Sequence, residues 1–173
     1  MNEAMLMIIL RLVHILGGIF WAGTALLIAW FLIPAHRSTG AAGMTFINEL
    51  MIRRKLRFHL TLAMILTILS GLGMYARMIA VSDGQWASTT MAKILGFGAI
   101  AGIIAGGLGG FVSGSIAAKM AALGKTIQDS GQPPTETQNV QMETHQDTMQ
   151  SVMRIVAVLL LIAVAAMASA RYL

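Results

Sequence analysis

Residues 12–35 read LVHILGGIFWAGTALLIAWFLIPA, an apolar run without Asp, Glu, Lys or Arg that only His14 interrupts. A helix of about 20 apolar residues, rising about 1.5 Å per residue, crosses the hydrocarbon core of a bilayer. Asn2 and Glu3 stand where a secretory signal would carry positive charge, and the run is longer than the apolar part of a signal peptide. The stretch therefore predicts a first transmembrane helix.

Three further runs lack charged side chains: LTLAMILTILSGLGMYA (60–76), ILGFGAIAGIIAGGLGGFVSGSIAA (94–118) and IVAVLLLIAVAAMASA (155–170). Together the four runs predict an all-α integral membrane four-helix bundle, one domain over residues 1–173. We expect the spans at about 4–34, 56–80, 90–118 and 152–172, joined by loops 35–55 and 119–151. The first loop becomes amphipathic, and the second is expected to wind into a helix after Pro133 and Pro134.

Composition supports a membrane protein. Of the 173 residues, 57% are hydrophobic and 11% charged, whereas soluble domains carry about 25% charged residues. The chain has no cysteine, which excludes disulfides, thiolate zinc sites and iron–sulfur clusters. The net charge of +5 fits basic flanks of membrane spans better than nucleic-acid binding.

The distribution of Lys and Arg predicts the orientation. With four spans, the side that carries both termini holds four cations, Arg11, Arg77, Lys93 and Arg171. The other side holds the remaining eight, including the cluster Arg53, Arg54, Lys55 and Arg57. Because positive charge favours the cytoplasmic side, we expect loops 35–55 and 119–151 in the cytoplasm and both termini outside, in an inner (cytoplasmic) membrane.

Polar residues within the spans are the candidates for chemistry. No Asp or Glu lies inside a span, which argues against proton relays and cation-coupled transport. Four basic residues remain, His14, Arg11, Arg77 and Lys93, and all are expected toward the outer leaflet. Intramembrane polar groups are costly and mark functional sites by default.

His14 shares one helix face with Arg11, Gly18 and Trp21, and Gly17 and Gly18 place no side chain one turn below it. A haem b ligated by His14 could lie against this bare backbone, with Arg11, Arg77 and Lys93 neutralising its propionates. The sixth position would be open or held by Met74, Met78 or Lys93. The spacing alone leaves open helix packing by His14 or another metal.

Methionine and glycine suggest further roles. The 14 methionines include Met74 and Met78 toward the outer side, and thioethers suit Cu(I), so copper handling is an alternative. Gly98, Gly102, Gly106, Gly110 and Gly114 repeat every four residues in the third span, a pattern typical of close helix packing in lipid. Its partner is another helix of the chain, a second copy or a larger complex; the sequence does not choose.

The stretch LVHILGGIFWAG, with His14 seven residues before Trp21, resembles the first span of the copper-resistance D (CopD) superfamily. It is also similar to the HemJ-type protoporphyrinogen oxidases, as are the basic helix before the second span, the Ser70-Gly71 step and the Trp86-to-Lys93 approach. The resemblance covers most of residues 8–118. It implies a four-helix haem b protein in which His14 binds the haem and Lys93 is catalytic. The chain departs from HemJ-type proteins at Leu32 to Pro34, where they carry an arginine, and in its glycine stripe.

We therefore expect a membrane-embedded b-haem redox protein, for electron transfer or as an oxidoreductase, with a quinone or a porphyrin as partner. The first alternative is a copper-handling membrane protein that uses methionines with His14. The second is a cofactor-free structural subunit of a membrane complex.

Overall fold

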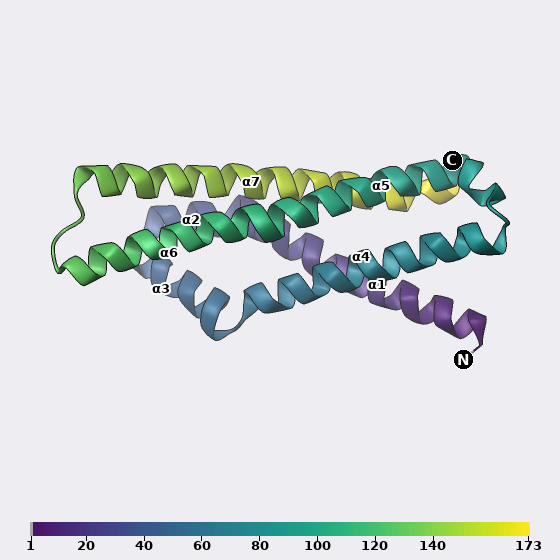
Figure 1. The fold of residues 1–173 in the computed structure, drawn as a ribbon, viewed down its shortest axis with the longest axis horizontal. Helices are drawn as coiled ribbons and strands as arrows, with labels where there is room; N and C mark the ends of the chain where they lie inside the picture. The colour runs from purple at the N-terminus through teal and green to yellow at the C-terminus, as the bar shows by residue number, and fades with distance from the viewer. Residues whose placement is uncertain (1) are drawn as a thin grey trace.

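The computed structural model describes residues 2–173, except for the side chain of Ala41, and contains no strand over that range. Four helical segments are long and apolar enough to cross a membrane: Glu3–Thr39, Leu56–Val81, Thr90–Ser130 and Glu136–Tyr172. The start of the first helix, the connection between the second and third, and the C-terminus all lie toward one end (Figure 1). The predicted all-α four-helix membrane fold is confirmed.

The first span is one continuous path of helix. Helix α1 (Glu3–Leu27) begins where the side chain of Asn2 accepts a hydrogen bond from the N–H of Ala4 at 2.7 Å. A π-helical turn, η1 (Ile28–Leu32), leads into α2 (Ile33–Thr39). Pro34 has no N–H to donate, and the wider turn lets the helix continue past it. Gly40 ends the helix with a φ of +57°.

The predicted loop 35–55 is largely helical. Helix α2 occupies its start, and α3 (Ala41–Asn48) and the π-helical turn η2 (Glu49–Arg53) continue it. Gly43 allows α3 to fold back on α2, since a Cβ there would lie 2.7 Å from the carbonyl oxygen of His36. Lys55 then turns the chain, with a φ of +54°, into α4 (Leu56–Val81).

The third and fourth spans also extend beyond their apolar runs. Thr89 caps α5 (Thr90–Gly107), which continues through η4 (Leu108–Val112) into α6 (Ser113–Ser130); the short η3 (Gln85–Ser88) precedes it. A capping box of Thr135 and Gln138 starts α7 (Glu136–Ser169), which ends in η5 (Ala170–Tyr172). The predicted loop 119–151 is thus mostly the polar ends of two neighbouring helices.

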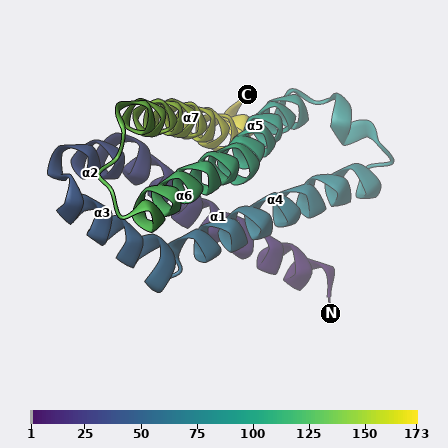
Figure 2. The same cartoon turned by 60° about the vertical axis from the view of Figure 1, so that its left-hand side comes forward.

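The helices associate as two pairs, α1 with α4 and α5 with α7. Figure 2 shows α5 and α7 side by side, with the start of α1 diverging from them. The buried core is made mainly of small residues around two larger ones, Trp21 and Leu160. Small side chains let helices approach closely, which is how helices associate in lipid. Large apolar side chains such as Leu16, Ile19 and Phe111 remain exposed, as expected for a surface that faces lipid.

The glycine stripe packs within the chain. A Cβ on Gly98 would lie 3.1 Å from the Cβ of Ala166 in α7. One on Gly106 would lie 3.1 Å from the Cδ1 of Ile68 and 3.2 Å from the Sδ of Met64, both in α4. The stripe therefore contacts α7 at Gly98 and α4 at Gly106. At these two positions, its partner is another helix of the same chain.

A polar contact joins the first and last helical segments. Nη1 of Arg37, in α2, lies 2.7 Å from Oδ1 of Asp147 and donates to Oε1 of Gln150 at 2.8 Å. Both partners lie in the polar first half of α7. This contact anchors α2 on the part of α7 that precedes the apolar run.

Candidate functional site

His14 is the centre of the candidate site. Its half-buried ring lies between α1 and α4, and Nδ1 is 2.8 Å from the carbonyl oxygen of Thr67. Because a carbonyl only accepts hydrogen bonds, Nδ1 carries the proton and donates it. Nε2 has no hydrogen-bond partner among residues 2–173 and is not enclosed, and in the neutral ring it is the nitrogen that carries the lone pair. Metal-binding histidines commonly have this arrangement, in which one ring N–H is fixed by a carbonyl and the other nitrogen is free.

Gly71 makes room for the imidazole. A Cβ at this position would lie 2.7 Å from Cε1 and 2.9 Å from Nδ1 of His14. Carbon atoms pack best at about 3.5–4.0 Å, so any side chain here would displace the ring. Gly71 on α4 therefore fixes the ring against the carbonyl of Thr67, one turn earlier on the same helix.

Gly17 and Gly18 are covered by Thr67 of α4. A Cβ on Gly17 would lie 2.6 Å from Oγ1 of Thr67, and one on Gly18 would lie 3.6 Å from its Cγ2. The backbone that we expected to face a macrocycle thus faces a neighbouring helix, at least on the side of Thr67. The Oγ1 of Thr67 is buried and has no hydrogen-bond partner among the described residues.

Of the three basic residues that we expected beside His14, one is paired elsewhere and two are exposed. Arg77 forms an ion pair with Glu3, which ties the end of α4 to the start of α1. Arg11 and Lys93 are exposed, and neither takes part in an ion pair within residues 2–173. Of the three, Arg11 and Lys93 are therefore the ones without an ion-pair partner among the described residues.

Lys93 lies in the first turn of α5, where α4 meets α5. The hydroxyl of Tyr75 donates to the carbonyl oxygen of Ala92 at 3.2 Å, and its ring meets Trp86 edge-on, with 5.0 Å between centroids. Met74 and Met78 are half-buried on α4. Met74 is about one turn after Gly71 on α4, the helix that contacts the ring of His14.

Sequence reasoning missed the roles of Thr67 and Tyr75, and it noted Gly71 only as part of a resemblance. A signal was present, since Thr67, Ser70 and Gly71 are spaced as one face of an otherwise apolar helix. Small and polar residues on one face of a transmembrane helix indicate the side that packs against another helix.

The described residues contain no group of three or more His, Asp or Glu side chains that could hold a metal ion. Haem differs from such sites because a single imidazole can supply the protein's ligand to iron.

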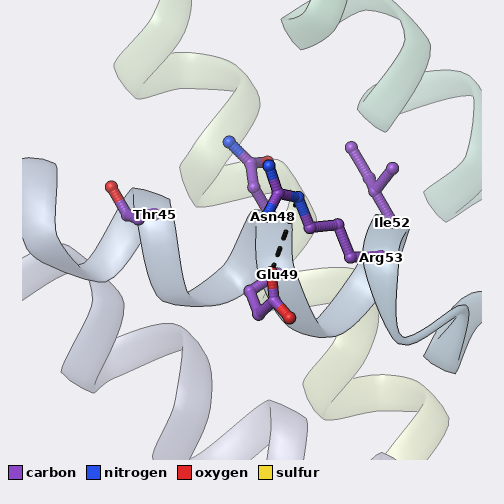
Figure 3. Close-up of a pocket in the computed structure, with 5 residues that line it drawn as sticks. All are labelled: Thr45, Asn48, Glu49, Ile52 and Arg53. Atoms are coloured by element: carbon purple, nitrogen blue, oxygen red, sulfur yellow. Dashed lines mark ion pairs between the residues drawn. The ribbon is translucent and has the colours of Figure 1, made fainter.

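A surface hollow of about 360 Å³ lies elsewhere, on α3 and η2 (Figure 3). Its lining residues are Thr45, Asn48, Glu49, Ile52 and Arg53. Oε2 of Glu49 lies 3.6 Å from Nε of Arg53, and Oε1 lies 3.0 Å from Nε of Arg54. The carboxylate is therefore shared by two arginines.

No family model matches this chain, and no curated protein or solved structure shows significant similarity to it. The resemblance to CopD and HemJ-type proteins therefore remains a prediction.

Proposed function

We propose that the protein is a membrane-embedded b-haem redox protein with His14 as the protein ligand to the iron. The observation that carries the proposal is the hydrogen bond from Nδ1 of His14 to the carbonyl of Thr67. It fixes the ring and leaves Nε2 as the ligating nitrogen. Gly71 leaves the space that this imidazole occupies between α1 and α4.

The residues around His14 have different roles in the proposed haem site. Thr67 and Gly71 orient the imidazole, and the uncovered side of the ring is where a planar ligand would bind. Arg11, one turn from His14, and Lys93 on α5 are unpaired cations suited to carboxylates. A bound b-type haem would supply a one-electron couple. Lys93 is also our candidate catalytic residue, and Lys93, Met74 and Met78 are candidates for the second axial position.

The same proposal includes the setting. We place the protein in an inner membrane with both termini outside, because eight of its twelve Lys and Arg residues flank the cytoplasmic ends of the spans. A quinone or a porphyrin, both soluble in the bilayer, is the proposed redox partner.

The test is a reduced-minus-oxidised spectrum of the full chain purified in detergent from cells supplied with haem precursor. We expect a Soret shift with α and β bands, and their loss in His14→Gln. Gln can donate an N–H to Thr67 but is a poor iron ligand, so this variant separates packing from ligation. His59→Gln is the matched control and keeps the spectrum, since His59 donates only to the carbonyl of Lys55, at 2.9 Å.

A colourless wild-type protein, or a His14→Gln variant that retains haem, would refute the proposal. Copper in the colourless protein would support copper handling by the methionines with His14. A colourless protein without metal would support the cofactor-free subunit. One observation favours that candidate specifically: Thr67 fills the space beside Gly17, so His14 and Thr67 already form a complete packing contact between α1 and α4.

A further inference from the structure

A second hollow, of about 440 Å³, lies at the elbow between η2 and α4. It is lined by Met51, Ile52, Lys55, Arg57, Phe58 and Thr61, and this lining contains no acidic residue. Figures 1 and 2 both show the elbow at the outer edge of the bundle, where α4 begins. The hollow therefore opens to the surroundings of the protein, beside the first turn of a membrane span.

The cations of the elbow fall into two classes. Arg53 and Arg54 share the carboxylate of Glu49, as Figure 3 shows for Arg53. Lys55 and Arg57 form no ion pair within residues 2–173. The lining of the hollow thus combines two unneutralised positive charges, and both belong to residues that we expect at the level of the lipid headgroups.

Local structure holds these two cations in place. The left-handed conformation of Lys55 turns the chain at the start of α4, and its carbonyl accepts a hydrogen bond from Nδ1 of His59 at 2.9 Å. The guanidinium of Arg57 lies against α6, because a Cβ on Gly114 would be 3.0 Å from its Nη2. The turn thus fixes the backbone of Lys55, and a neighbouring helix positions the guanidinium of Arg57.

Two large apolar side chains flank the cations. Ile52 is 70% exposed and Phe58 is 61% exposed, although each sits beside a basic residue. Exposed apolar surface next to positive charge at the end of a span matches an amphiphile with an anionic head and an apolar tail. A free anion would leave both apolar side chains without a partner.

We propose that this elbow binds the headgroup of an anionic phospholipid. Lys55 and Arg57 hold the phosphate, and Ile52 and Phe58 contact the start of the acyl chains. The proposal is independent of haem binding, since none of its residues belongs to the site around His14.

The test is native mass spectrometry of the full chain, extracted from nanodiscs with equal amounts of phosphatidylglycerol and phosphatidylcholine. We expect wild type to retain phosphatidylglycerol preferentially. The double variant Lys55→Asn/Arg57→Gln removes both unpaired cations, and Asn tolerates the left-handed backbone at position 55. At roughly fivefold in affinity for each cation, the preference falls roughly 25-fold.

The matched control is Lys119→Gln/Lys125→Gln on α6, which removes the same charge outside the lining of the hollow, and it should keep most of the preference. An equal loss in both double variants would show general electrostatic attraction and overturn the site. So would a wild-type protein without preference for phosphatidylglycerol. Displacement of the lipid by inorganic phosphate would show a free-anion site instead. The single variants Lys55→Asn and Arg57→Gln, each expected to lower the preference severalfold, replace the double variant if it does not fold.

Discussion

Replacing Gly71 with alanine tests the contact that defines the candidate site. The new Cβ would lie 2.7 Å from Cε1 of His14, about 1 Å closer than a comfortable carbon contact. The ring must move, and the 2.8 Å hydrogen bond from Nδ1 to Thr67 is stretched or lost. Overpacking costs about 1–3 kcal/mol, and a hydrogen bond between membrane helices contributes about 0.6 kcal/mol. Alanine regains up to about 1 kcal/mol of helix propensity, so we expect a net loss of about 1–3 kcal/mol.

Gly73→Ala is the matched control, two residues later on the same helix. Its Cβ would meet only Leu10, at 3.8 Å from Cδ1, which is ordinary contact, so the variant should be neutral or slightly more stable. The free energy of unfolding is measured by titration of both variants with denaturing detergent. If Gly71→Ala is as stable as Gly73→Ala, the ring of His14 is not held as described, and our assignment of its free nitrogen fails with it.

Three further predictions concern the buried hydroxyl of Thr67, the glycine stripe and the orientation in the membrane. Thr67→Val should leave stability unchanged or raise it, because the buried hydroxyl has no protein partner; a loss of 1 kcal/mol or more on detergent titration would reveal a bound water or ligand there. Gly106→Leu should abolish the folded monomer on size-exclusion chromatography, whereas Gly107→Leu, with nothing within 4 Å of its Cβ, should be tolerated; equal behaviour would contradict intramolecular packing of the stripe. A cysteine at position 2 should react with an impermeant thiol reagent in intact cells, and one at position 130 should not; the reverse pattern would invert the proposed orientation.

The fold class was predictable because the length and hydropathy of continuous stretches of sequence determine which of them can cross a bilayer. Four apolar runs free of Asp, Glu, Lys and Arg favour four spanning helices, since only helices and closed barrels satisfy the backbone hydrogen bonds in a bilayer and continuous apolar runs of this length are typical of helices. The ends of those helices were not predictable from hydropathy. Residues 119–130 are polar but still helical, because α6 continues from an apolar stretch. The helix expected after Pro133 and Pro134 is confirmed, and it starts at a good cap, Thr135.

The sequence alone singled out His14 as the centre of the candidate site, but it did not identify Thr67 and Gly71 as the residues that contact His14. His14 stands out because an imidazole inside an apolar span needs a partner. Which helix supplies the partner depends on how α1 and α4 cross, and that is a property of their packing rather than of either sequence. For the same reason the sequence placed Arg77 beside His14 by depth, whereas the structure pairs it with Glu3 from the end of another helix.

Packing and ligation at His14 are compatible, because they use different nitrogens of one ring. The hydrogen bond to Thr67 uses Nδ1 and its proton, and ligation of iron would use Nε2. A glutamine could also donate an N–H to the carbonyl of Thr67, but it would not offer an imidazole nitrogen to a metal. The free Nε2 is therefore the feature of the structure that favours ligation by His14, as we propose, over packing by His14 alone.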